Sequence, residues 1–92
     1  MELAGRRCLV TGGGRGIGRA IALALAREGA KVALLARTEA ELNETAALVE
    51  ELGAEVLPLQ ADVEQREQVD AAIEKMLAEW DGVEVLVNNA GI

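Results

Sequence analysis

A glycine-rich stretch near the amino terminus constrains the fold of this chain more than any other feature. Residues 11–18 (TGGGRGIG) follow the apolar run 8–10 (CLV) and lead into a segment rich in Ala and Leu. A strand, a glycine turn and a helix start form a phosphate-binding element, because backbone N–H groups at a helix N-terminus are unpaired and carry partial positive charge. Glycines let that backbone approach a pyrophosphate without a Cβ in the way. The stretch therefore predicts a site for a phosphate-bearing ligand.

The rest of the chain alternates short apolar runs with longer amphipathic segments. The apolar runs predict strands at Arg7–Thr11, Lys31–Ala36, Glu55–Leu59 and Val83–Val87. The intervening segments predict helices at Gly16–Glu28, between a Thr38–Glu41 capping box and Gly53, and at Glu64–Trp80. Gly29 is expected to end the first helix, and Asp81-Gly82 to turn the chain into the last strand.

Three-and-four spacing of apolar residues predicts the inward face of each helix. The residues expected to face the core are Ile17, Ala20, Ile21, Ala24 and Leu25 in the first helix, Leu42, Thr45, Val49 and Leu52 in the second, and Val69, Ile73, Met76, Leu77 and Trp80 in the third.

Strict alternation of strands and helices with short connections predicts one α/β domain spanning residues 1–92. Such a β-α-β-α-β-α-β chain forms parallel strands joined by right-handed crossovers, with helices on both faces in three layers. The expected sheet order is 3-2-1-4, half of a Rossmann fold. Pro58 cannot donate to a strand ladder, which independently predicts that the third strand lies at an edge.

The spacing of the glycines and two later motifs resemble one protein family. Gly12, Gly16 and Gly18 give G-x-x-x-G-x-G rather than the common G-x-G-x-x-G, with Asp62-Val63 after the third apolar run and Asn88-Asn89-Ala90-Gly91 after the fourth. This pattern is similar to the amino-terminal half of short-chain dehydrogenases/reductases, with the closest likeness to the 3-oxoacyl-carrier-protein reductase branch. The resemblance implies a cofactor site made of Gly12, Gly14, Arg15, Gly16, Ile17, Gly18, Arg37, Asp62, Val63, Asn89, Ala90 and Gly91.

The end of the second strand bears on which cofactor is bound. An acidic residue there would bind a ribose 2′-hydroxyl and select NAD, but the strand ends in Leu35-Ala36 and is followed by Arg37. Arg37 and Arg15 can pair with a 2′-phosphate, since guanidinium groups donate in a fixed fork. NADP is therefore the expected cofactor, and NAD is the alternative if Glu39 or Glu41 turns toward a ribose.

Two later residues have more than one interpretation. Asp62 contacts the adenine in the family, with the Val63 backbone beside it, but Asp62-x-x-Gln65 is also a capping pattern for the third helix. Asn88 is expected to hold neighbouring strands through its amide, while Asn89, Ala90 and Gly91 by resemblance line the ribose and nicotinamide side.

Composition excludes several functions. A net charge of −7 argues against nucleic acid as a partner, since the sequence has no basic stripe. The single cysteine, Cys8, is expected to pack as a small apolar residue, and no cluster of His, Cys and Asp has metal-ligand spacing. Neither a signal peptide nor a membrane span is evident, which favours a cytoplasmic protein.

The sequence offers no proton donor for carbonyl reduction. The family uses a Tyr with a nearby Lys, assisted by Ser and Asn, and all those positions fall beyond residue 92. The chain has no Tyr, Ser or His, and neither Lys31, which begins a strand, nor Lys75, on a helix, can replace the catalytic lysine.

Three functions are consistent with these observations. The chain is expected to be a dinucleotide-binding module, a self-associating fragment without useful cofactor affinity, or one piece of a split reductase. A stop directly after the Asn-Asn-Ala-Gly motif suggests a truncated or designed fragment. Self-association into a homodimer is expected through the Val83–Val87 side, where the complete fold would add a fifth strand.

Overall fold

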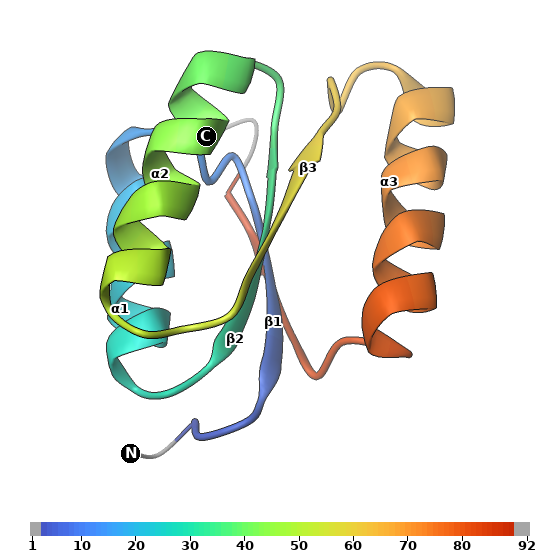
Figure 1. The fold of residues 1–92 in the computed structure, drawn as a ribbon. Helices are drawn as coiled ribbons and strands as arrows, with labels where there is room; N and C mark the ends of the chain where they lie inside the picture. The colour runs from blue at the N-terminus through green and yellow to red at the C-terminus, as the bar shows by residue number, and fades with distance from the viewer. Residues whose placement is uncertain (1–2, 90–92) are drawn as a thin grey trace.

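A computed structural model describes residues 3–89 and shows a parallel sheet between two layers of helices (Figure 1). The strands lie in the order β3-β2-β1-β4, and every neighbouring pair is parallel. The predicted half Rossmann fold is confirmed. Its elements are β1 (Arg7–Thr11), α1 (Gly16–Arg27), β2 (Lys31–Ala36), α2 (Glu39–Glu51), β3 (Val56–Gln60), α3 (Arg66–Trp80) and β4 (Val85–Asn88).

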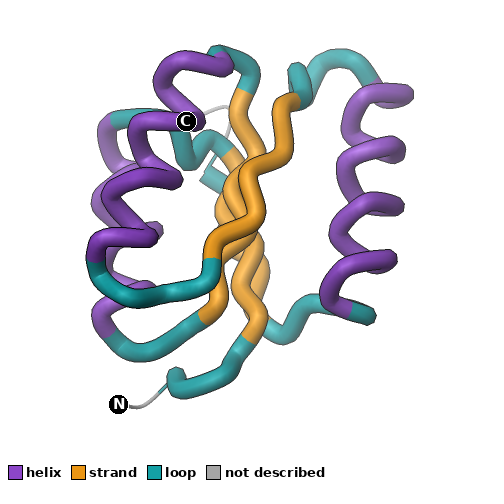
Figure 2. The backbone as a smooth tube through the Cα atoms, in the orientation of Figure 1, coloured by secondary structure: helices purple, strands orange, loops and turns teal. Residues whose placement is uncertain are grey.

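Helices α1 and α2 cover one face of the sheet and α3 covers the other (Figure 2). Because side chains alternate across a strand, Cys8 and Val10 of β1 pack on the face covered by α1 and α2, and Leu9 packs on the face covered by α3. Cys8 is completely buried, as its small apolar character predicts, and burial raises the pKa of its thiol. The core under α1 and α2 is built mainly of aliphatic side chains, and the core under α3 also contains Met76 and Trp80.

Pro58 lies in β3 at one edge of the sheet, as the sequence predicts. β3 pairs only with β2 among the described strands, so the missing N–H of Pro58 leaves no gap inside a ladder. The strand begins at Val56 and ends at Gln60, one residue later at each end than predicted.

The buried face of α1 differs from the prediction. Its fully buried positions are Gly18, Ala22 and Ala26, whereas Ile17 is 65% exposed. Three small residues at four-residue spacing bring the helix axis close to the glycine loop and the sheet, so that larger neighbours such as Ile21 are only half buried. The spacing of apolar residues did not predict this buried face, because glycine is not counted as an apolar residue in such a pattern.

Both predicted side-chain caps are absent. Thr38 occupies the N-cap position of α2 but makes no side-chain hydrogen bond there, and Glu41 pairs with Arg15 instead. α3 begins at Arg66 with Gln65 at its N-cap, two residues later than predicted. The Asp62 carboxylate accepts a hydrogen bond from the Glu64 N–H at 2.9 Å, which forms a turn before the helix rather than a cap on it.

Two leucines predicted to be buried are substantially exposed. Leu52 follows the last residue of α2 and is 43% exposed, and Leu77 of α3 is 48% exposed. In both helices the neighbouring core positions, such as Val49 and Met76, are buried as predicted. The exposed leucines therefore lie where no described element packs against the helix.

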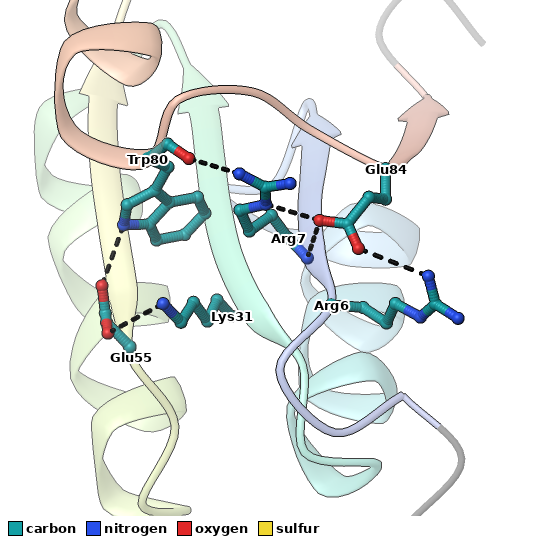
Figure 3. A network of polar contacts seen from close by, with 6 residues as sticks. All are labelled: Arg6, Arg7, Lys31, Glu55, Trp80 and Glu84. Atoms are coloured by element: carbon teal, nitrogen blue, oxygen red, sulfur yellow. Dashed lines mark hydrogen bonds and ion pairs between the residues drawn. The ribbon is translucent and has the colours of Figure 1, made fainter.

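The amino ends of the strands are joined by a network of charged and polar side chains (Figure 3). The Arg7 guanidinium donates to the Trp80 carbonyl at 2.6 Å and to the Glu84 carboxylate, and Arg6 contacts the same carboxylate at 3.4 Å. These contacts hold the pKa of Glu84 below its usual value, with the hydrogen bond from Arg7 as the largest cause. The bend at Glu84 delays the start of β4 to Val85, two residues later than predicted.

The same network reaches the opposite sheet edge. The Trp80 indole N–H donates to Glu55 at 2.8 Å, and Lys31 lies 3.8 Å from another oxygen of that carboxylate. The contacts join the end of α3 to Glu55, which precedes β3, and through it to Lys31 at the start of β2 (Figure 3). These contacts hold the strands together at the end of the sheet that lies away from the glycine loop.

Among residues 3–89, no helix combines the length and the apolar character that crossing a lipid bilayer requires.

Candidate functional site

A cleft of about 490 Å³ opens where the carboxyl ends of the strands meet the loops that follow them. Parallel α/β sheets place ligands at this edge, outside the strand ends. Most residues of the predicted site contribute to the cleft. Its lining residues are Gly12, Gly14, Arg15, Gly16, Ile17, Leu35, Ala36, Arg37, Thr38, Glu41, Ala61, Asp62, Val63, Glu64 and Asn89.

The glycine loop shapes one wall of the cleft. Gly12 and Gly16 have φ angles of +70° and +57°, a left-handed backbone that other residues adopt only with strain. The Gly12 N–H donates to the Leu35 carbonyl at 2.7 Å and so fixes the loop to β2. α1 then begins without a side-chain cap at Arg15 and without an acidic residue in its first turn. Its positive end therefore faces the cleft without a side-chain cap.

Gly18 belongs to the predicted site but does not line the cleft. A Cβ at this position would lie 1.9 Å from the Gly12 oxygen and 2.8 Å from Nδ2 of Asn89. Its role in the structure is to let α1 approach the turn closely, so that the helix N-terminus reaches the cleft. Gly18 thus affects the cleft indirectly, through the position of α1.

Two residues that were not predicted as part of the site, Arg19 and Thr45, hold the glycine loop in place. The Gly14 carbonyl accepts hydrogen bonds at 2.8 Å from both Arg19 of α1 and Thr45 of α2. Arg19 also donates to the Thr45 hydroxyl at 2.8 Å and to Glu44 at 2.6 Å. The only sequence signal was the polar Thr45 at a predicted core position, since a buried hydroxyl needs a partner.

Two arginines and one glutamate share the side of the cleft formed by α2. Arg15 is 80% exposed, and its Nε lies 3.7 Å from a carboxylate oxygen of Glu41. The Arg37 carbonyl accepts a hydrogen bond from Gln60 at 3.2 Å, but within residues 3–89 no ion pair involves its guanidinium. The Arg37 charge is therefore available to an anionic group in the cleft.

Asp62 and Val63 line the cleft just beyond the end of β3. The Asp62 N–H donates to the Gln68 side chain at 2.9 Å, and its carboxylate closes the turn to Glu64. Val63 is 47% exposed and offers an apolar surface toward the cleft. This side is suited to a flat apolar group with polar atoms at its rim.

Asn88 ends β4 and Asn89 follows it, and both contact the Thr11 hydroxyl group. Asn88 accepts a hydrogen bond from the Thr11 hydroxyl at 3.1 Å and so joins the carboxyl ends of β4 and β1, the structural role expected for it. The Asn89 N–H donates to the Thr11 hydroxyl oxygen at 2.9 Å, and Asn89 lines the cleft. Ala90 and Gly91, also predicted for the site, lie outside the described residues.

The described part of the chain brings together no group of three or more His, Cys, Asp or Glu side chains able to hold a metal ion. Lys31 begins β2 at the end of the sheet away from the cleft and pairs with Glu55. Lys75 lies on α3 and is not among the cleft residues.

Comparisons with known proteins agree with this geometry. The family model described as short chain dehydrogenase matches residues 6–92. General stress protein 39 of Bacillus subtilis (strain 168) is 43% identical over 91 residues, which are 98% of this chain and 32% of that protein. The chain therefore spans about a third of the length of this relative.

Two solved structures match the fold closely. L-Sorbose reductase from Gluconobacter frateurii, complexed with NADPH and L-sorbose, has a TM-score of 0.93 and 41% identity, over 98% of this chain and 35% of that one. NAD+-bound xylitol dehydrogenase has a TM-score of 0.96 and 37% identity, over 100% of this chain and 35% of that one.

Proposed function

The chain belongs to the short chain dehydrogenase family, and on that premise we propose that it binds a nicotinamide dinucleotide in the cleft, with a preference for NADP. The observation that carries the proposal is the uncapped N-terminus of α1 behind a glycine loop that opens into the cleft. A pyrophosphate there would accept hydrogen bonds from backbone N–H groups and meet the positive end of the helix dipole.

The rest of the cleft accommodates the adenosine half of such a ligand. Asp62 and Val63 are suited to the adenine, with the exposed Val63 side chain as an apolar contact and Asp62 as a polar one. Asn89 lines the cleft beside β1 and is proposed to lie near the ribose and nicotinamide side, as are Ala90 and Gly91. These residues supply shape and polarity, while the loop supplies the phosphate contact.

The preference for NADP rests on Arg15 and Arg37. Both line the cleft; Arg15 forms a solvent-exposed ion pair with Glu41, and no ion pair among the described residues involves Arg37. A 2′-phosphate next to them would form charge-assisted hydrogen bonds that a 2′-hydroxyl cannot form. One similar structure contains NADPH and another NAD+, so the arginines of this chain and not its fold carry the preference.

Arg37→Ala should weaken NADP binding about tenfold and NAD binding less than twofold, because a charge-assisted hydrogen bond to the 2′-phosphate is lost. Isothermal titration calorimetry would measure both affinities. We expect dissociation constants on the order of micromolar to millimolar for the unaltered chain.

Arg27→Ala is the matched control for this experiment, since Arg27 is exposed in the last turn of α1 and is not among the cleft residues. It removes the same charge and should leave both affinities unchanged. Equal losses of NADP and NAD affinity in Arg37→Ala would contradict the 2′-phosphate assignment. Failure of the unaltered chain to bind either dinucleotide would contradict the proposed function itself.

We further propose that the 92-residue chain binds without reducing a carbonyl by itself. Hydride transfer to a ketone needs a proton donor near the oxygen, and the sequence contains no Tyr, Ser or His to provide one. NADPH absorbance at 340 nm, followed with a ketone or an acetoacetyl thioester, should show no substrate-dependent decay on the order of enzymatic rates. Ketone-dependent oxidation that persists through repeated purification would overturn this part of the proposal.

A second copy of the chain is the partner that we propose for the free edge of β4. Among the described strands β4 pairs only with β1, and Leu86 in it is 62% exposed. The strand Val85–Asn88 contains no charged side chain, so like charges within it do not oppose pairing with its own copy. Two such strands related by a twofold axis would pair antiparallel and continue the sheet.

A further inference from the structure

Glu41 occupies an unusual place in a cleft proposed to bind an anion. It lies in the first turn of α2, lines the cleft, and its carboxylate is 3.7 Å from the Arg15 guanidinium. The pair is open to solvent, since the side chains of Arg15 and Glu41 are 80% and 36% exposed. Surface pairs of this kind contribute little to stability, so a ligand can break this one at small cost.

The backbone at Glu41 is held tightly against the glycine loop. A Cβ added at Gly14 would lie 3.3 Å from Glu41 Cβ and 3.2 Å from Ala36 Cβ. Thr45, one turn further along α2, donates to the Gly14 carbonyl at 2.8 Å and fixes the helix to the loop. Glu41 therefore cannot withdraw with its helix when a ligand enters, and its carboxylate remains within reach of Arg15.

A carboxylate in this position acts against a phosphate in two ways. It occupies the Arg15 guanidinium, which must release it before donating to another anion. It also repels a dianionic group brought near Arg15, at a distance where the interaction between charges is only partly screened by solvent. A ribose with a free 2′-hydroxyl suffers neither penalty because it carries no charge there.

From these contacts we propose that Glu41 restrains the selectivity of the cleft by pairing with Arg15, so that a 2′-phosphate binds more weakly than the two arginines alone would allow. This inference rests on the proposed binding of a dinucleotide. Glu41 is thus a specificity-determining residue for the nucleotide 2′ position. Its substitution should widen the difference between NADP-type and NAD-type ligands.

The experiment uses two fragments that differ at the 2′ position, adenosine 2′,5′-bisphosphate and adenosine 5′-monophosphate. Glu41→Gln keeps the shape of the side chain and removes its charge. By calorimetric titration it should tighten binding of the bisphosphate about three- to tenfold and change binding of the monophosphate less than twofold. The gain should shrink as salt is raised from about 50 to 500 mM, because it is electrostatic.

Glu39→Gln is the matched control, since Glu39 lies in the same first turn of α2 but does not line the cleft. A general charge effect would give the same gain in both variants, and that result would overturn the inference. Most of the gain from Glu41→Gln should disappear in an Arg15→Ala background, where the pair no longer exists.

The remaining outcomes separate the inference from the function on which it rests. If both fragments bind and Glu41→Gln leaves their affinity ratio unchanged, Glu41 has no role in selectivity while the proposed function stands. Weaker binding of the monophosphate in Glu41→Gln would make Glu41 a hydrogen-bond acceptor for the ribose and would also overturn the inference. If neither fragment binds to the unaltered chain or to the variant, the proposed function fails and the inference with it.

Discussion

Replacing Gly18 by alanine should destabilise the chain by about 3 kcal/mol or more and abolish dinucleotide binding. An added Cβ would lie 1.9 Å from the Gly12 oxygen and 2.7 Å from its carbonyl carbon, so backbone must move. Separation of α1 from the glycine turn relieves these contacts, and it takes the helix N-terminus away from the cleft. Urea unfolding, followed by the fluorescence of the buried Trp80, would measure the free energy of unfolding.

Gly16→Ala is the matched control for this prediction. A Cβ at Gly16 meets nothing within 4 Å, but its φ of +57° is strained for alanine, so the expected cost is about 1–2 kcal/mol. The two variants make the same chemical change two residues apart in one helix. If Gly18→Ala unfolds at the same urea concentration as the unaltered chain, the close packing of α1 on the turn does not hold.

Leu86→Lys should dissociate the proposed dimer at concentrations of tens of micromolar, which we expect to be the working range for such a contact. Leu86 is 62% exposed at the middle of β4, on the same face of the sheet as Leu9 and α3. A lysine at the centre of a paired edge would meet its own copy across the twofold axis, and lysines on edge strands oppose such pairing. Sedimentation equilibrium would distinguish the 9.7 kDa monomer from a dimer.

Leu77→Lys is the control, because Leu77 is also exposed but lies on α3 and not on the strand edge. Both substitutions add one positive charge to a chain of net charge −7, so general repulsion between chains decreases in each. Dissociation by Leu77→Lys alone would place the contact on the helices. A single 9.7 kDa species for the unaltered chain would exclude the dimer altogether.

The order and type of the elements could be predicted from the sequence because they depend on local chemistry. Apolar runs and helical spacing predicted each strand and helix that the structure describes. The predicted ends differ from the observed ends by no more than two residues. Pro58 predicted that β3 lies at an edge of the sheet, because proline has no N–H to donate to a neighbouring strand. The glycine spacing likewise located the loop at the N-terminus of α1.

Residues far apart in the sequence made the site, and these pairings could not be predicted. Arg19 and Thr45 meet at the Gly14 carbonyl, and the predicted Thr38–Glu41 cap gave way to the Arg15–Glu41 pair. A capping pattern describes one segment and cannot register a competing arginine from another loop. Tertiary packing decides whether Glu41 contacts Thr38 or Arg15.

The sequence by itself determined a half Rossmann fold with a glycine loop before α1, because backbone preference and apolar periodicity act over a few neighbouring residues. Only the tertiary structure decided which face of α1 is buried, since Gly18, Ala22 and Ala26 follow from how closely the helix approaches the turn. It also decided which carboxylate faces which arginine, as between Arg7 and Glu84 at one end of the sheet and between Arg15 and Glu41 at the other. Charges interact through space with whatever the fold brings near, and local sequence does not encode that distance.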